Sequence, residues 1–147
     1  MVACPTRGRK EHPSVNKILV AYDGGEPARR ALDTAAELAR LTGASIAVVS
    51  VVPTHPGRFP VDPWDDTSVH AQELLEARRS LREKGIEADL IEPTGDPAPT
   101  IERIAEEGGY DTVVIGSRGL NAMGRILQGS VSEHVATHAK VTVVVAR

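Results

Sequence analysis

The fold is decided by the stretch Lys17-Ile-Leu-Val-Ala-Tyr22, an apolar run that ends at Asp23-Gly24-Gly25. A run of this kind, followed by a polar turn rich in glycine, indicates a buried strand that enters a tight turn. A helical pattern comes next, in which Pro27 suits the first turn and Gly43 the C-terminal end. The apolar face of this helix is expected to carry Ala28, Ala31, Leu32, Ala35 and Ala39.

The same alternation of apolar runs and helical patterns continues to the end of the sequence. We expect further strands over 45–52, 86–91, 112–115 and 141–146, and further helices over about 69–84, from Pro97 to Gly108 with Asp96 as N-cap, and over 129–139. Strict alternation predicts an α/β fold with a five-stranded parallel, doubly wound, Rossmann-like sheet and helices on both faces. In such sheets ligands bind beyond the carboxyl ends of the strands, where the strand order reverses. The ends of the first, second and fourth strands are therefore the expected site.

Length and composition indicate a single domain. The chain has 147 residues, of which 41% are hydrophobic and only 3% aromatic, so the core must be built from Val, Ile, Leu and Ala. Residues 1–15 contain Pro5, Gly8 and Pro13 without apolar periodicity, and we interpret them as a flexible extension. Residues 16–147 are then expected to form the α/β domain.

Charge and cysteine content argue against several classes of partner. The net charge is −3 with both signs interspersed, which predicts neither nucleic-acid nor membrane binding. No stretch approaches the roughly 18 apolar residues that a membrane span needs. Cys4, the single cysteine, cannot form a disulfide within the chain, which favours a reducing compartment. We therefore expect a cytoplasmic protein.

Two glycine-containing segments near the C-terminus predict an anion site. Gly116 and Gly119 follow the fourth strand, and missing side chains there let backbone N–H groups approach an anion. Gly129-Ser130 falls where a helix should begin, with its unpaired N–H groups and positive dipole end, and Ser132 adds a hydroxyl. The segments match neither a Walker A loop nor a Rossmann fingerprint. On spacing alone, turns and a helix cap explain the glycines equally well.

The spacing of these residues resembles that of a known family. Gly116, two residues, Gly119, nine residues and Gly129-Ser130 resemble the G-x2-G-x9-G-S/T pattern of ATP-binding universal stress proteins. The runs from Lys17 to Gly24 and from Asp111 to Gly119 also look like the first and fourth strands of that family, so the resemblance covers 17–147. It implies a nucleotide-responsive stress or signalling module that binds ATP and forms a homodimer through strand 141–146.

 The cofactors that the resemblance implies are thus ATP and Mg2+.

The resemblance also implies roles for individual residues. Ala21, Tyr22 and Val51 match positions around adenine, partly through backbone groups, and Asp23 matches a contact to the ribose or to a phosphate-bound Mg2+. The nucleotide-binding set is completed by Gly116, Arg118, Gly119, Arg125, Gly129, Ser130, Val131 and Ser132. Simpler roles stay open: Asp23 as a turn residue, Val51 as core, and both arginines as exposed loop positions. Gly25 replaces a serine that is frequent in the family, so one hydroxyl donor is lost.

No residue of the sequence is assigned a catalytic role. Asp23 is the one carboxylate expected near the phosphates, and no His or Glu is placed by the sequence to orient water. Slow ATP hydrolysis and binding of AMP or cyclic AMP remain alternatives to ATP binding alone. A phosphorylated receiver domain is excluded, because Ile91-Glu92-Pro93 offers no aspartate at the end of the third strand.

Two further features are interpreted without a ligand. His134 and His138 are four residues apart, the spacing of two zinc ligands on a helix, but the sequence pattern supplies no third ligand. We interpret the pair as a solvated helix face, and no metal site is predicted. The proline-rich loop 53–67 carries Phe59 and Trp64 and is either a lid, a partner contact or a linker.

Overall fold

Strands and helices alternate along the whole chain. The computed structural model describes residues 15–52, 67–117 and 130–146. The elements in chain order are β1 (Lys17–Ala21), α1 (Glu26–Thr42), β2 (Ser45–Val49), α2 (Thr67–Glu83), β3 (Ala88–Ile91), α3 (Pro97–Glu107), β4 (Thr112–Gly116), α4 (Ser130–His138) and β5 (Thr142–Ala146). Each predicted strand and helix is therefore present, which confirms the predicted α/β class.

The five strands form one parallel sheet in the order β3-β2-β1-β4-β5. β1 pairs with β2 on one side and with β4 on the other, with Leu19 opposite both Ala47 and Val113. The chain therefore builds the sheet outward from β1 in one direction and then in the other. The strand order reverses between β1 and β4, which is where a doubly wound sheet places its ligand site.

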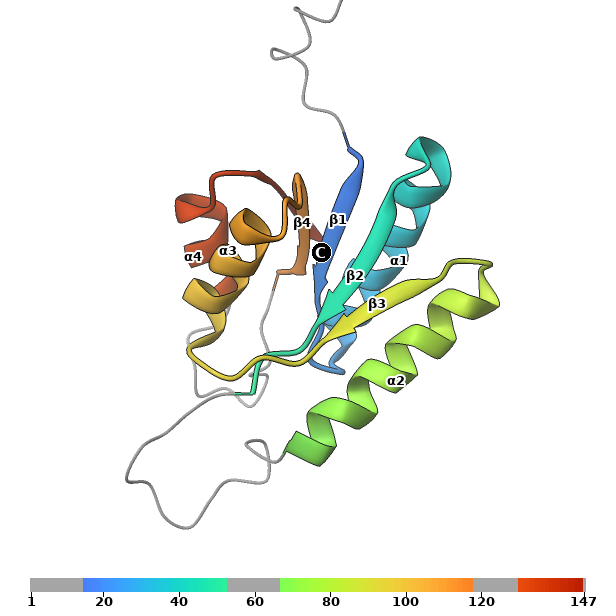
Figure 1. Cartoon of the computed structure of the whole chain (residues 1–147), viewed down its shortest axis with the longest axis horizontal. Helices are drawn as coiled ribbons and strands as arrows, with labels where there is room; N and C mark the ends of the chain where they lie inside the picture. Colours follow the sequence, from blue (N-terminus) through green and yellow to red (C-terminus); the bar gives the residue numbers. More distant parts are fainter. Residues whose placement is uncertain (1–14, 53–66, 118–129, 147) are drawn as a thin grey trace, which may run out of the picture.

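Helices cover both faces of the sheet (Figure 1). Alternate strand residues point to opposite faces, so β1 sends Ile18 and Val20 to the cluster under α1 and α2, and Leu19 to the cluster under α3 and α4. The first cluster is rich in alanines from α1, which let the helix lie close to the strands. All three of these β1 side chains are fully buried.

The predicted helix boundaries agree with the structure at several capping residues. Pro27 lies in the first turn of α1, and Gly43 ends that helix in the left-handed conformation with φ 78°, donating its N–H to Ala39. Asp96 occupies the N-cap position of α3, but its side chain makes no capping hydrogen bond. β2 is shorter than predicted: its regular pairing ends at Val49, and Val52 forms only an isolated bridge with Thr94.

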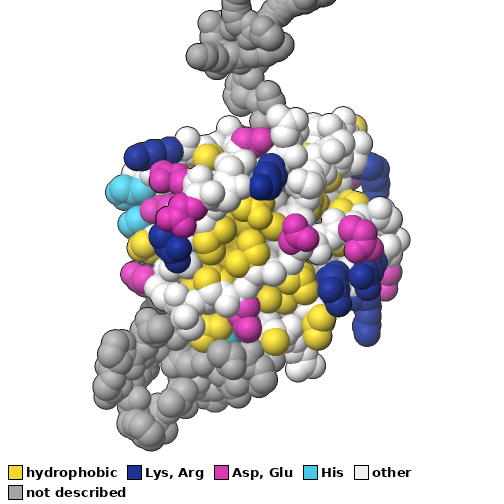
Figure 2. Space-filling model, in the orientation of Figure 1, with side chains coloured by type: hydrophobic (Ala, Val, Ile, Leu, Met, Phe, Trp, Pro, Cys, Tyr) yellow, Lys and Arg dark blue, Asp and Glu magenta, His cyan; other side chains and the backbone are white. Residues whose placement is uncertain are grey.

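The surface of the described residues carries charges of both signs. Figure 2 shows Lys, Arg, Asp and Glu side chains of both signs around a hydrophobic patch near the middle of the visible face. Among the described helices, none is long and apolar enough to cross a membrane. The predicted extension 1–15 and loop 53–67 fall almost entirely outside the described residues, so they stay predictions.

Candidate functional site

The candidate site lies where β1, β2 and β4 end. Tyr22 continues the chain beyond β1, and its N–H donates to the carbonyl of Val49 at 2.9 Å. Ser117 follows β4, and its N–H donates to the carbonyl of Ala146 at 2.8 Å. These bonds continue the pairing of β1 with β2 and of β4 with β5 beyond the strand ends. β1 and β4 are themselves paired neighbours, so their exits lie beside one another where the strand order reverses.

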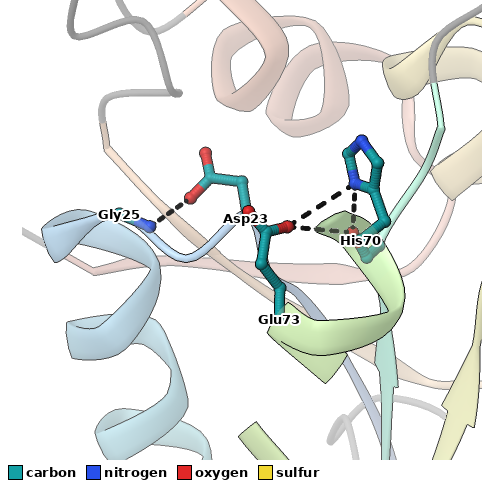
Figure 3. A network of polar contacts seen from close by, with 5 residues as sticks. Asp23, Gly25, His70 and Glu73 are labelled. Atoms are coloured by element: carbon teal, nitrogen blue, oxygen red, sulfur yellow. Dashed lines mark hydrogen bonds and ion pairs between the residues drawn. The ribbon is translucent and has the colours of Figure 1, made fainter. Parts of the chain in front are cut away.

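Asp23 shapes the turn between β1 and α1. Its Oδ1 accepts the N–H of Gly25 at 2.8 Å, while Gly24 adopts the left-handed conformation with φ 82°. The turn role that the sequence left open is therefore present. Figure 3 shows the second carboxylate oxygen pointing away from Gly25, so it is not used by this hydrogen bond. Burial raises the pKa of Asp23, because a desolvated carboxylate is harder to ionise.

A buried polar network lies next to this turn (Figure 3). Ser50 follows β2, and its Oγ lies 2.8 Å from Nδ1 of His70 and 3.5 Å from Oε1 of Glu73. Nδ1 of His70 and Oε1 of Glu73 are themselves 3.5 Å apart. Ser50 and His70 are almost fully buried, with 1% and 5% exposure. The first turns of α2 thus place two titratable side chains at the carboxyl end of β2.

Glu73 is the most perturbed acid of this network. Burial, and then the nearby charge of Asp23, raise its pKa to about 7. Its carboxylate also packs closely against the β1–α1 turn: a Cβ added to Gly24 would meet Oε2 of Glu73 at 3.0 Å. Near neutral pH, Glu73 therefore exchanges a proton easily, which is typical of carboxylates at functional sites.

Ser50, His70 and Glu73 were not predicted as site residues from the sequence. Two signals were present: a serine interrupts the apolar run from Ala47 to Val52, and His70 and Glu73 have the i, i+3 spacing that puts them on one helix face. Neither signal identifies the other partner, because the packing of α2 against the end of β2 is a tertiary contact.

The predicted adenine positions divide between the two faces of the sheet. Ala21 and Val51 are partly buried beside the cluster under α3 and α4, as is Val131 of the wider nucleotide-binding set. The ring of Tyr22 instead packs in the cluster under α1 and α2, where burial raises its pKa despite the hydrogen bond to Arg29. Tyr22 can therefore face a ligand beside Ala21 and Val51 only through its backbone, as the predicted backbone contacts require.

Gly116 has a packing role that its spacing from Gly119 and Gly129 does not predict. A Cβ at this position would lie 2.7 Å from the backbone carbonyl of Pro27, closer than real Cβ contacts. Glycine therefore lets the first turn of α1 approach the end of β4. That close approach brings the β1–α1 turn and the β4 exit together.

The remaining predicted residues lie only partly within the described part of the chain. α4 begins at Ser130, so the predicted helix start is confirmed, but the side chains of Ser130 and Ser132 are not among those described. Arg118, Gly119, Arg125 and Gly129 lie outside the described residues. Their nucleotide-binding roles stay predictions.

Comparison with known proteins identifies the family. The sequence model of the universal stress protein family matches residues 14–147. The chain belongs to the universal stress protein family. The universal stress protein YxiE of Bacillus subtilis is 32% identical over 146 residues, an alignment that covers 90% of this chain and 99% of the relative.

Solved structures of universal stress proteins share the fold. The protein UspA from Lactobacillus plantarum superimposes with a TM-score of 0.71 at 26% identity, covering 91% of this chain and 99% of the other. A universal stress protein from Archaeoglobus fulgidus, solved in complex with dAMP, gives a TM-score of 0.69 at 25% identity, covering 92% of this chain and 99% of the other. These likenesses agree with the five-stranded parallel sheet described above.

Proposed function

We propose that this universal stress protein binds ATP, with Mg2+, at the carboxyl ends of β1, β2 and β4 and acts as a nucleotide-responsive stress or signalling module. The observation that carries the proposal is the juxtaposition of the Asp23 turn and the Gly116 exit at the reversal of strand order. The G-x2-G-x9-G-S spacing from Gly116 to Ser130 supports a phosphate-binding role for the segments that follow. The dAMP complex of the Archaeoglobus relative supports an adenine nucleotide as the ligand.

In the proposed complex, adenine lies at the carboxyl ends of the strands, on the face of the sheet that α3 and α4 cover. The partly buried side chains of Ala21, Val51 and Val131 provide apolar contacts there. Asp23 meets the ribose hydroxyls or Mg2+ through the oxygen that Gly25 does not use. Backbone N–H groups of 116–119 and 129–130, with Ser130 and Ser132, hold the phosphates, and Arg118 and Arg125 pair with them.

Electrostatics set a condition on this arrangement. A triphosphate next to Asp23 and Glu73 would be repelled if both carboxylates were ionised. The pKa of Glu73, about 7, means that a large share of Glu73 is neutral near physiological pH. Mg2+ bound between Asp23 and the phosphates would offset the remaining charge.

Calorimetric titration with ATP, AMP and cyclic AMP, each with and without Mg2+, tests the proposal. We expect one nucleotide per chain, with ATP binding strengthened by Mg2+. The variant Gly119→Val should weaken ATP binding at least tenfold, because its side chain blocks the approach of phosphate to the backbone. Circular dichroism must show the variant folded. Unchanged ATP affinity in folded Gly119→Val would contradict the phosphate site, and tighter AMP or cyclic AMP binding would replace ATP as the ligand.

Slow ATP hydrolysis is a second candidate function, favoured by a specific observation. The sequence offered no base beside Asp23, but the structure places His70 and Glu73 there, with Glu73 able to accept a proton near neutral pH. Release of labelled phosphate should then exceed the buffer rate and fall in Glu73→Gln while ATP still binds. Phosphate release at the buffer rate in the native protein would exclude hydrolysis and leave the binding role intact.

We also propose that the protein is a cytoplasmic homodimer that pairs through strand 141–146. β5 is an edge strand of the sheet, and Val145 is an exposed large hydrophobic residue with 39% exposure. An edge of this kind can pair with another strand. The dimer would cover this edge in the assembled protein.

A further inference from the structure

Three potential metal ligands meet on the surface formed by α3 and α4. Glu102 comes from α3, and His134 and His138 come from α4. One ligand atom from each residue can be chosen so that all three lie within 4.8 Å of one another. The sequence pattern lacked a third ligand for the two histidines; the packing of α3 against α4 supplies one.

The polar contacts of the two imidazoles fix which of their atoms can bind a metal. Nδ1 of His138 lies 3.0 Å from the carbonyl oxygen of His134, and since a carbonyl only accepts, Nδ1 carries the proton. The Nε2 lone pair of His138 is then directed elsewhere, as in metal-binding histidines whose other nitrogen donates to a carbonyl. Nδ1 of His134 lies 2.8 Å from Oε2 of Glu102.

The two helices that carry the three residues are anchored by buried side chains. Val135, next to His134 in sequence, is fully buried, and so are Ile101 and Ala105 on either side of Glu102. The two imidazole rings are stacked, with centroids 4.2 Å apart and planes inclined by 24°. Metal bonds of about 2.0–2.2 Å need ligand atoms closer than 4.8 Å, and rotation of exposed side chains can supply that approach.

The basic side chains near this cluster pair with carboxylates outside it, so they do not occupy the proposed ligands. Lys140 pairs with Glu106 at 3.9 Å, and Arg103 pairs with Glu107 at 3.5 Å. The histidines and acidic side chains adjoin at one edge of the face in Figure 2, over α4. The side chains of His134 and Glu102 retain 43% and 18% exposure, so a hydrated ion can reach them.

We infer that Glu102, His134 and His138 form a binding site for a divalent transition metal of the Zn2+ class. Two imidazole nitrogens and one carboxylate oxygen are ligands that suit Zn2+, Cu2+ and Ni2+, whereas Mg2+ prefers oxygen ligands alone. Water would complete the coordination shell, because only three protein ligands converge. The site is therefore distinct in chemistry from the Mg2+ proposed with ATP.

Competition between the full-length protein and a fluorescent zinc indicator tests the inference in the absence of nucleotide. The Cys4→Ser background removes a thiol that would also bind zinc. We expect one equivalent of Zn2+ to bind, and millimolar Mg2+ not to displace it. His138→Ala and Glu102→Gln should each weaken this equivalent at least tenfold. The control Glu107→Gln, on the same helix but outside the cluster, should leave it unchanged.

Electron paramagnetic resonance of bound Cu2+ provides a readout of the ligands themselves. The native protein should show nitrogen couplings from two imidazoles, and His134→Ala should show one fewer. Circular dichroism checks that each variant is folded. Zinc affinity that is unchanged in folded His138→Ala and Glu102→Gln, or that falls equally in Glu107→Gln, would overturn the inference.

Discussion

At the scale of single residues, Glu73 links the pH of the solution to the stability of the fold. Its side chain is 12% exposed and lies against the β1–α1 turn, near Asp23. Because its pKa is about 7 in the folded protein and 4.5 as the ordinary value, the folded state binds more protons than the unfolded state between these pH values. The contribution of Glu73 to stability must therefore decrease as pH rises from about 4.5 to above 7.

The variant Glu73→Gln should remove this pH dependence. Relative to the native protein, its free energy of unfolding should rise by about 1–3 kcal/mol between pH 5 and pH 8, because glutamine carries no charge to desolvate. Urea unfolding at both pH values measures the difference. Glu83→Gln, an exposed position on the same helix, should show no such change. A constant difference between Glu73→Gln and the native protein would show that Glu73 titrates normally.

Gly116 gives a second test at this scale. Gly116→Ala should lower the free energy of unfolding by about 1–3 kcal/mol, because the added Cβ meets the backbone of Pro27 at 2.7 Å. Urea unfolding measures the loss. In Gly109→Ala the added Cβ meets no atom within 4 Å, but φ is +73°, so this variant isolates backbone strain of about 1 kcal/mol. If Gly116→Ala were as stable as the native protein, the close approach of α1 to β4 would not require glycine at this position.

The sequence predicted residue roles where local chemistry is decisive, and missed them where packing is. Gly43 could be assigned as a helix end because its left-handed conformation is a local requirement. The network of Ser50, His70 and Glu73 could not be assigned, since it requires α2 to pack against β2. The role of Gly116 toward Pro27 was missed for the same reason.

At the scale of elements, hydrogen bonds to Asp111 connect the start of β1 to the start of β4. Its carboxylate accepts the N–H groups of Asn16 and Lys17 at 3.0 and 3.1 Å, and the hydroxyl of Thr112 at 2.9 Å. The two bonds from Asn16 and Lys17 join segments that are 95 and 94 residues apart in the chain. They fix the register of the two strands whose opposite ends form the candidate site.

Removing this carboxylate should weaken the pairing of β1 and β4. Asp111→Ala is expected to lower the free energy of unfolding by about 1.5–3 kcal/mol, the range for hydrogen bonds to a charged group. Urea unfolding of Asp89→Ala, an exposed aspartate on β3, serves as the control and should differ from the native protein by less than about 0.5 kcal/mol. Equal stability of both variants would show that the Asp111 carboxylate does not stabilise the pairing of β1 and β4.

Element order was predictable because each apolar run is followed by a helical pattern with glycine or proline at its ends. The ends of strands were less predictable. β2 was expected to reach Val52, but regular pairing stops at Val49, since the partner strand β3 ends at Ile91. Where a strand stops depends on its neighbour, and the neighbour is not visible in the local sequence.

At the scale of the whole molecule, the order β3-β2-β1-β4-β5 leaves two strands at the edges. If β5 is the dimer contact, Val145→Lys should shift the protein toward monomer, because a charge would be placed at the strand interface. Light scattering after size-exclusion chromatography measures the mass. Leu75→Lys, exposed on α2, is the matched control and should leave the mass unchanged. A monomeric native protein, or a Val145→Lys variant of dimer mass, would exclude this interface.

We propose that one adenine nucleotide binds where β1, β2 and β4 end. Titration of the 15N-labelled protein with ATP and Mg2+, followed by backbone amide chemical shifts, tests it most directly. We expect the largest shifts on the amides of 21–25, 116–119 and 129–132. Absence of shifts at millimolar ATP, or shifts confined to other surfaces, would contradict it.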